Sequence, residues 1–182
     1  MSKPPRSPYP PDVDEGSPSV HALEDLVDAV VGDVDWANGR AVRIALERVE
    51  LRRVRLTGAE LAEANVRDAT FDECRIDLAG LRHTRLERVV FRDCRMTECD
   101  LYGAVLKDVL FERCELREAT FSGCRLERVE LRGCDLAGLR GPEALRGARI
   151  PWHDVLANAA VFATALGVEI VDGPLEQASG GR

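Results

Sequence analysis

Apolar residues recur at every fifth position through the central part of the chain. The run begins at Leu46 and ends at Leu136, and all 19 of its positions are apolar. The residue two places before each of these centres is small or aliphatic, with Thr84 as the one polar member. Charged residues fill most of the other three positions. This pattern predicts two inward side chains in every repeat.

A period of five fits neither a helix nor an ordinary strand, because a helix buries a face every 3.6 residues and a strand every 2.0. Two inward positions around one outward residue indicate a very short strand, after which the chain must turn. Four such segments close a square coil, so the same face should return at every fourth repeat. Two sets of residues recur with this spacing: Phe71, Phe91 and Phe111, and Cys74, Cys94, Cys114 and Cys134. We expect each set to form an inner column in a β-solenoid of roughly five coils, stacked about 4.8 Å apart.

The repeat resembles the pentapeptide-repeat family, whose consensus is a small residue, then Asp or Asn, then Leu or Phe, then two polar residues. The closest copies are Ala59-Glu60-Leu61, Ala64-Asn65-Val66, Cys99-Asp100-Leu101 and Cys134-Asp135-Leu136. The resemblance covers at least residues 44–138, and it implies an all-β, right-handed quadrilateral β-helix. One departure concerns the residue before each centre. It is Asp or Asn only at Asn65, Asp100 and Asp135, and in the other repeats it is often Arg or Glu. The outer surface therefore differs from the consensus while the inner lining keeps it.

The two ends of the chain differ from the repeat. Residues 1–18 contain six prolines and predict a disordered arm. Residues 19–33 predict a capping helix, and the β-helix then spans residues 34–150. Residues 151–171 predict a helix that ends at Gly167 and one last strand at residues 168–171, followed by a flexible tail at 172–182. Caps are expected because an open solenoid end exposes unpaired backbone and core.

The predicted C-terminal helix carries a larger apolar face than one coil end needs. We therefore expect a homodimer that buries Val155, Ala159, Phe162 and Leu166, with Trp152 at the edge. A two-fold interface would use the same patch on both chains. The alternative is that this face only caps its own solenoid.

Outward apolar residues on the coils suggest a second interaction surface. They are Leu78, Val90, Tyr102, Val105 and Leu110. Val90 and Leu110 share one outward position on neighbouring coils, so they are expected to lie side by side. An exposed apolar patch can mark a partner surface, but scattered apolar surface residues are also common. Both interpretations remain open at this point.

The cysteines and histidines do not point to chemistry. All six cysteines occupy the same inward repeat position, there is no C-x-x-C pair, and the three histidines form no ligand-like cluster. We interpret the cysteines as small buried hydrophobic residues. No nucleophile elbow, phosphate-binding loop or zinc-protease helix is recognisable. We expect no enzymatic activity, no cofactor and no metal site.

The charge distribution limits the choice of partner. The net charge of −7 comes from residues 1–40 and 151–182, whereas residues 41–150 are nearly neutral. No basic footprint favours direct binding of nucleic acid. No apolar run is long enough for a membrane span, and the N-terminus lacks a secretory signal, so we expect a cytoplasmic protein that does not bind membranes.

Two functions of different classes follow. The first is a non-catalytic rod that binds an unidentified protein partner. The second is implied by the family resemblance, since its quinolone-resistance members are dimers that mimic DNA on DNA gyrase and are similar in size and C-terminal helix. DNA mimicry needs a continuous acidic surface. The outward charges summed over the four faces of the predicted coil range only from about −1 to +2, so we rank the interaction rod above the gyrase modulator.

Overall fold

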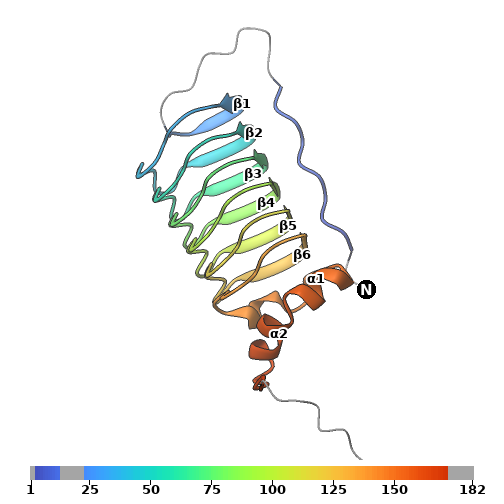
Figure 1. Ribbon diagram of the computed structural model, residues 1–182. Coiled ribbons are helices and arrows are strands. Elements are labelled where there is room, and N and C mark those ends of the chain that lie inside the picture. Colours follow the sequence, from blue (N-terminus) through green and yellow to red (C-terminus); the bar gives the residue numbers. More distant parts are fainter. Residues whose placement is uncertain (1–2, 13–22, 172–182) are drawn as a thin grey trace, which may run out of the picture.

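The structure is a computed structural model that describes residues 3–12 and 23–171 (Figure 1). Its elements, in chain order, are β1 (Leu26–Gly32), β2 (Ala45–Arg52), β3 (Asn65–Asp72), β4 (Arg85–Arg92), β5 (Val105–Glu112), β6 (Arg125–Arg132), a 3₁₀ helix η1 (Pro142–Leu145), α1 (Trp152–Ala157) and α2 (Ala159–Ala165).

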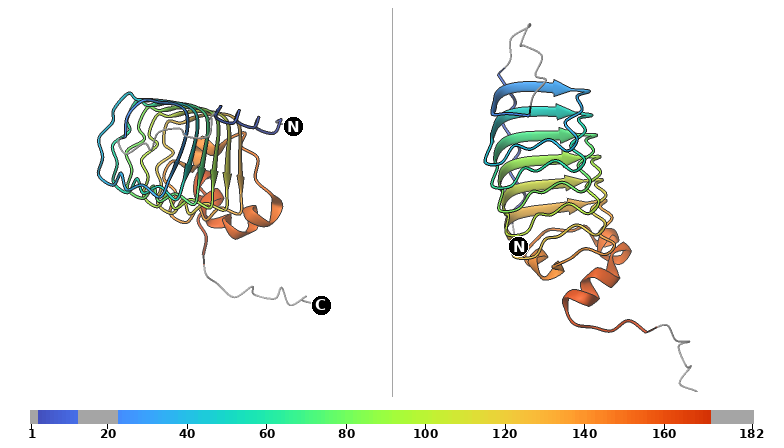
Figure 2. Two further views of the ribbon diagram at one scale, coloured as in Figure 1. Left: turned by 90° about the horizontal axis from the view of Figure 1, so that it is seen from above. Right: turned by 90° about the vertical axis from the view of Figure 1, so that its left-hand side faces the viewer.

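The six strands form one parallel sheet in which each strand pairs with the strand one coil later. The register is constant, so that Leu46 pairs with Val66 and Val66 with Leu86, each one coil further on. Single bridges with the same offset, such as that between Arg75 and Arg95, join the other sides of the coils. Figure 2 shows the coils stacked in one column. The predicted β-solenoid, with four repeats in each coil, is confirmed.

Each corner of the coil is a residue in the left-handed backbone conformation. Positive φ recurs at every fifth residue from Asp28 to Gly138, always two residues after an inward centre. Glycine adopts this conformation freely, whereas another residue there costs roughly 1–2 kcal/mol. Most of these corners are nevertheless Asp, Glu or Arg. The corners turn the chain once in every repeat and point their side chains away from the core.

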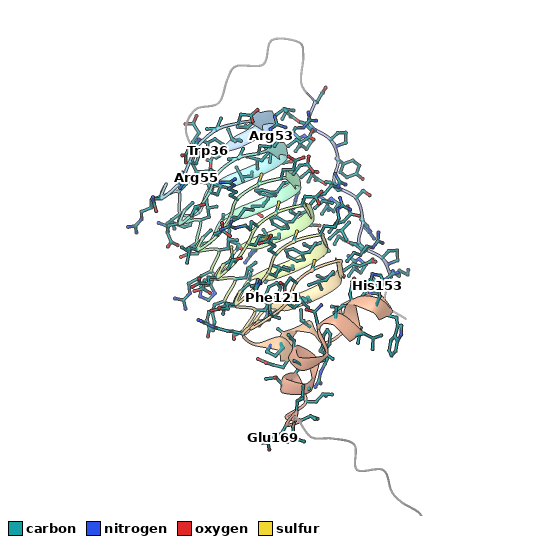
Figure 3. The ribbon with its side chains drawn as sticks, in the orientation of Figure 1. Trp36, Arg53, Arg55, Phe121, His153 and Glu169 are labelled. Atoms are coloured by element: carbon teal, nitrogen blue, oxygen red, sulfur yellow. The ribbon has the colours of Figure 1, made fainter. Side chains whose placement is uncertain are left out.

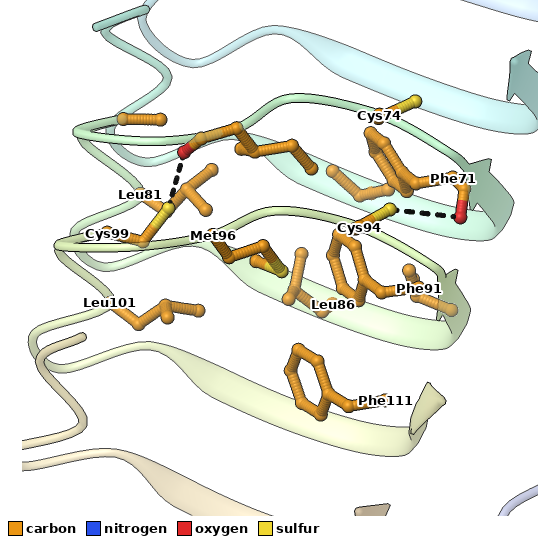
Figure 4. Close-up of a cluster of buried hydrophobic side chains, with 14 of the residues drawn as sticks. Phe71, Cys74, Leu81, Leu86, Phe91, Cys94, Met96, Cys99, Leu101 and Phe111 are labelled. Atoms are coloured by element: carbon orange, nitrogen blue, oxygen red, sulfur yellow. Dashed lines mark hydrogen bonds between the residues drawn. The ribbon is translucent and has the colours of Figure 1, made fainter. Parts of the chain in front are cut away.

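The core is a stack of similar layers. The ring centroids of Phe71 and Phe91 lie 4.8 Å apart, and those of Phe91 and Phe111 lie 5.1 Å apart, with interplanar angles of 19° and 6° (Figure 4). Phe121 meets Phe111 edge-on at 6.0 Å. The predicted phenylalanine column is therefore confirmed, and its rings are stacked at about the spacing of the coils.

Four of the cysteines, Cys74, Cys94, Cys114 and Cys134, form one column inside the coils, as predicted. Each thiol donates a hydrogen bond to the carbonyl oxygen of the residue 23 positions earlier, one coil back. The bond from Cys94 to Phe71 measures 3.3 Å (Figure 4), and that from Cys114 to Phe91 measures 3.4 Å. The other four bonds run from Cys74 to Leu51, Cys99 to Ile76, Cys124 to Leu101 and Cys134 to Phe111. Cysteine thus fills a small inward position and also gives a buried carbonyl a second partner.

The buried thiols should be unreactive in the folded protein. Burial raises the pKa of Cys99 to about 12 and that of Cys124 to about 11, and the thiolate is the reactive form. At neutral pH we expect no rapid reaction of the native chain with an aromatic disulfide reagent, and six equivalents after unfolding in denaturant. Cys124, which is partly exposed, should react first. Rapid native reaction of Cys94 or Cys99 would contradict the burial of these thiols.

The N-terminal part of the repeat begins earlier than predicted. Residues 26–32, which we assigned to a capping helix over residues 19–33, form strand β1 instead. The cause is visible in the five-residue register, which continues backwards through Ala41, Trp36 and Val31 to Leu26, all of them buried. Residues 19–22 of that prediction lie outside the described residues, as do residues 1–2 and 13–18 of the predicted arm and the predicted tail at 172–182.

The described part of the arm is not detached from the rod. Residues 3–12, which we expected to be disordered, run alongside the sheet from the level of β5 to that of β1 (Figure 1). Proline-rich segments favour the stiff polyproline II conformation, which keeps a chain extended without internal hydrogen bonds. Such a segment needs external partners for its free N–H groups.

The C-terminal cap contains two short helices instead of one long helix. α1 and α2 meet at Asn158, which is buried together with Asp154 against the last coil. The Asp154 carboxylate accepts the N–H of Gly133 at 2.7 Å, and Asn158 accepts the N–H of Leu136 at 2.9 Å. Asn158 also donates to the carbonyl of Cys134 at 3.1 Å. These side chains take the place of the backbone that a further coil would supply.

The predicted strand at residues 168–171 is wrong. These residues have no strand pairing and are exposed, and the N–H of Val168 bonds to the carbonyl of Ala163 at the end of α2. The last coil offers this segment little to pair with, because Asp154 and Asn158 already occupy backbone groups at its edge.

Candidate interaction surfaces

Ion pairs between neighbouring coils cover much of the outer surface. Arg53 pairs with Asp33 at 2.6 Å and Arg113 pairs with Asp93 at 2.7 Å, in each case from one coil to the next. Further pairs of this kind join Arg55 to Asp35, Arg67 to Glu87, Arg92 to Glu112 and Lys107 to Glu87. In these pairs opposite charges lie one above another along the rod axis. Arg55, Arg75 and Arg95 are an exception, since they stand in line with the same sign.

One corner of the coil carries a regular column of alternating charge. We call it the Asp–Arg column, and it consists of Asp28, Arg48, Asp68, Arg88, Asp108 and Arg128. Each arginine holds the aspartate one coil before it through two parallel hydrogen bonds of 2.6 to 2.8 Å, from Nε and Nη2. Such bidentate pairs are the strongest side-chain ion pairs and fix the carboxylate in place.

The arm lies along this column. Three backbone N–H groups donate to the aspartates, from Arg6 to Asp108, from Tyr9 to Asp68 and from Asp12 to Asp28, all at 3.1 Å. The guanidinium of Arg88 lies 5.7 Å from the ring centroid of Tyr9, within cation–π range. Asp68 and Asp108 are buried under these contacts, and Asp108 is 1% exposed.

Hydrogen bonding lowers the pKa values of the three aspartates. The bonds from Arg48 and from the N–H of Asp12 hold the pKa of Asp28 at about 2. Arg128 lowers the pKa of Asp108 in the same way. Burial raises the pKa of Asp68, but the bonds from Arg88 and from the N–H of Tyr9 outweigh it, so the net shift is downward. All three are therefore carboxylates at neutral pH, able to accept hydrogen bonds.

The lowered pKa values predict how stability changes with acid. A carboxyl group whose folded pKa lies below its unfolded value of about 3.9 stabilises the fold above that pH and loses this contribution as pH falls through the folded value. We expect the melting temperature to stay level from neutral pH to about pH 5 and to fall between about pH 4 and pH 2. Thermal unfolding followed by circular dichroism measures this. A melting temperature that rises on acidification would contradict the paired carboxylates.

The residues predicted as a partner surface do not gather into one patch. Leu78, Tyr102 and Val105 are exposed, but Leu78 lies at one corner of the coil and Tyr102 beside the next. Tyr102 contacts Arg82, whose guanidinium lies 5.0 Å from the ring centroid.

Val90 and Leu110 are paired neighbours in β4 and β5, as predicted. The expectation that they are exposed is wrong, because Val90 is 9% exposed and Leu110 is partly buried. Val90 points outward two residues after Arg88, so it lies next to the Asp–Arg column that the arm covers.

The predicted dimer residues divide between packed and exposed positions. Trp152 is 73% exposed and Leu166 is 81% exposed, and Ala159 is also exposed. Val155 and Phe162 are half-buried, and Phe162 packs against the core. Both helices stand at the end of the coil stack, with His153 on α1 (Figure 3).

Further apolar residues at this end were not predicted as part of the surface. They are Leu156 on α1 and Val168, Ile170 and Val171 after α2, all exposed. A groove of about 280 Å³ lies between η1 and α2, lined in part by Pro142, Leu145, Phe162 and Leu166. We call these exposed residues, with Trp152 and Leu166, the C-terminal apolar surface. Leu156 was missed because a single long helix would have placed it off the predicted face.

Within residues 3–12 and 23–171, no group of three or more His, Cys, Asp or Glu side chains is placed to hold a metal ion. In the same described part of the chain, no helix is long and apolar enough to cross a membrane.

Two overlapping segments of the chain, residues 44–121 and 68–140, match the family model described as a pentapeptide repeat region. Together they cover more than half of the chain. The chain belongs to the pentapeptide-repeat family. No curated protein sequence matches it.

Solved structures similar to this pentapeptide-repeat protein come from several settings. A protein of the Arabidopsis thaliana thylakoid lumen is 22% identical, with a TM-score of 0.49 over 50% of this chain and 64% of that one. HetL from Nostoc, involved in heterocyst differentiation regulation, is 20% identical, with a TM-score of 0.43 over 70% and 66%. QnrB1, a plasmid-mediated fluoroquinolone resistance protein, is 19% identical, with a TM-score of 0.35 over 83% and 99%. The chain spans just under two thirds of the length of the first two. The fold alone assigns no role.

Proposed function

We propose that this pentapeptide-repeat protein is a non-catalytic docking rod that forms a homodimer through its C-terminal apolar surface. The observation that carries the proposal is the contrast between the two kinds of surface. The sides of the coils carry many ion pairs with scattered exposed apolar residues such as Leu78, whereas Trp152, Leu166 and Val171 at the end of the rod are more than 70% exposed. Apolar surface of this kind gains roughly 25 cal/mol for each Å² removed from water.

Capping alone does not account for this end of the chain. The residues that close the last coil are Asp154, Asn158 and Val161, which are buried. Trp152, Leu156 and Leu166 project away from the coil and take no part in closing it. The same patch on a second chain would cover them in a two-fold interface.

Charge substitutions on the C-terminal apolar surface test the proposal. We expect the wild-type chain to sediment as a dimer at micromolar concentration, and Leu166→Glu and Trp152→Glu to sediment as monomers. The matched control is Leu78→Glu, which places the same charge at an exposed leucine on the side of a coil and should leave the dimer intact. A monomeric wild type, or equal disruption by Leu78→Glu, would refute the homodimer.

Modulation of DNA gyrase is the second candidate, because the family to which the chain belongs includes the quinolone-resistance proteins, for which this role is known. The charge pattern supports it less well. Duplex DNA carries one negative charge for each 1.7 Å of its axis, roughly, all of one sign, whereas the Asp–Arg column changes sign at every coil. We expect gyrase supercoiling to be unchanged by this protein with or without a fluoroquinolone. Inhibition, or protection from the drug, at low micromolar concentration would favour the gyrase role.

We also propose a cytoplasmic location. All six cysteines are free in the structure, and a reducing compartment keeps thiols in that form. Fractionation of cells that express the tagged chain tests this location.

A further inference from the structure

The spacing of the arm matches the spacing of the coils. Three residues of the arm, from Arg6 to Tyr9 or from Tyr9 to Asp12, advance by two coils of the Asp–Arg column. Three residues of polyproline II rise about 9.3 Å, and two coils rise about 9.6 Å. The difference is small enough for the register to hold over all three contacts.

The prolines of the arm fall at positions that suit this register. Five of the ten residues 3–12 are proline, and none of the three residues that donate to the column is. Pro5, Pro8 and Pro11 precede the three donors, and they are the half-buried residues of this segment while its other residues are exposed. Polyproline II has three residues per turn, so one edge of the arm presents rings and N–H groups to the rod and the rest faces solvent.

The rod provides acceptors that are fixed before the arm binds. Arg48, Arg88 and Arg128 each hold one aspartate with two bonds. The same Oδ1 atom that accepts from the arginine Nε also accepts the N–H of the arm. A bond from an N–H to a carboxylate is charge-assisted and stronger than one to a neutral acceptor. The alternation of Asp and Arg gives the acceptors their period of two coils.

The arm behaves as a ligand more than as a part of the core. None of its described residues belongs to the hydrophobic core, and Tyr9 is 65% exposed. The column binds mainly backbone N–H groups of the arm. Any segment with the same proline pattern can present such groups.

We propose that the Asp–Arg column is a binding site for polyproline II segments, and that a proline-rich segment of a partner protein with a free N–H at every third residue binds there in place of residues 3–12. This inference deepens the docking role proposed above and rests on it. The arm of the same chain competes for the column. A partner segment can bind only while the column is free, so its apparent Kd is the intrinsic Kd divided by the fraction of time for which the column is free.

The test uses the full-length chain with its arm released. The triple variant Arg6→Pro, Tyr9→Pro and Asp12→Pro removes the three donors and keeps the polyproline II preference of the arm. The probe is a fluorescent peptide of residues 1–14, titrated by anisotropy. We expect it to bind the triple variant at least tenfold more tightly than the wild-type chain. The matched control is Ser7→Pro, which removes an N–H with no acceptor among the described residues and should bind the probe as weakly as wild type.

Two peptide variants make the outcome specific. A probe that carries the same three prolines should not bind the triple variant, whereas a probe with Ser7→Pro should bind it normally. Absence of binding by the unmodified probe, or equal binding of all three probes, would overturn the inference. The dimer measurement is independent of this result, so failure of the peptide test with dimerisation intact refutes the polyproline II site and leaves the C-terminal interface standing.

Discussion

Leu101→Lys is expected to leave the chain unfolded. Leu101 has no exposed surface and points into the middle of the coil stack (Figure 4). The substitution removes the burial of a leucine, about 1.5–3 kcal/mol, and places an ammonium group without a partner in an apolar lining, which costs several kcal/mol more. The sum is comparable with the whole stability of a small protein, about 5–15 kcal/mol. Far-ultraviolet circular dichroism and size-exclusion chromatography measure the loss.

The matched control introduces the same residue on the outside of the same coil. Glu98 is exposed and at a corner, so Glu98→Lys should change the free energy of unfolding by less than about 0.5 kcal/mol. Native-like spectra for Leu101→Lys would show that the five-residue centres do not line the core.

Asn158→Leu is expected to destabilise the C-terminal coil by about 2–5 kcal/mol, because it leaves the N–H of Leu136 and the carbonyl of Cys134 buried and without these partners. Hydrogen exchange should quicken first in residues 131–140, next to the cap. Asn158→Asp keeps an acceptor for Leu136, but it turns a buried carboxylate oxygen toward the carbonyl oxygens of Cys134 and Asp154. Its effect should therefore be at least as large.

Ala157→Gln is the control on the neighbouring helix α1, since Ala157 is exposed and lies outside the C-terminal apolar surface, and a change there should be within about 0.5 kcal/mol. Equal exchange in Asn158→Leu and wild type would contradict the capping role.

The inner lining was predictable from the sequence because side-chain volume decides it. A narrow four-sided coil accepts one large and one small residue per side, and the positions of Phe91 and Cys94 follow from that rule. The start of the solenoid at Leu26 was missed for the opposite reason. Aspartate at position 28 and valines at 27 and 30 fit a helical spacing as well as a coil, and pairing with β2 decides between them.

The cap shows how a polar side chain can be the one that is buried. The predicted helix was oriented by its apolar residues, with Val155 and Phe162 on a face expected to be buried in a homodimer or, alternatively, against the last coil. In the structure Asp154 and Asn158 face the rod, because an open coil end presents N–H and carbonyl groups that apolar side chains cannot satisfy. Apolar residues left over by this arrangement, Leu166 among them, remain on the outside.

The arm was predicted to be disordered from its proline content. Composition alone does not show that its N–H groups are spaced to match the aspartates of the Asp–Arg column. Two patterns in the sequence carried the missing signal: proline at every third position, 5, 8 and 11, and aspartate in every second coil, at positions 28, 68 and 108. Neither pattern alone predicts that the arm binds the rod. Together they do, because three residues of polyproline II rise by about the height of two coils.

Hydrogen exchange of the wild-type chain at low and high micromolar concentration tests the account of a docking rod most directly. Association protects the amides that it covers, and protection by mass action grows with concentration. The account predicts that amides of residues 152–166 gain protection as concentration rises, while those of Arg6, Tyr9 and Asp12 are protected equally at both concentrations. Protection in residues 152–166 that does not change with concentration, with a monomeric mass throughout, would contradict it.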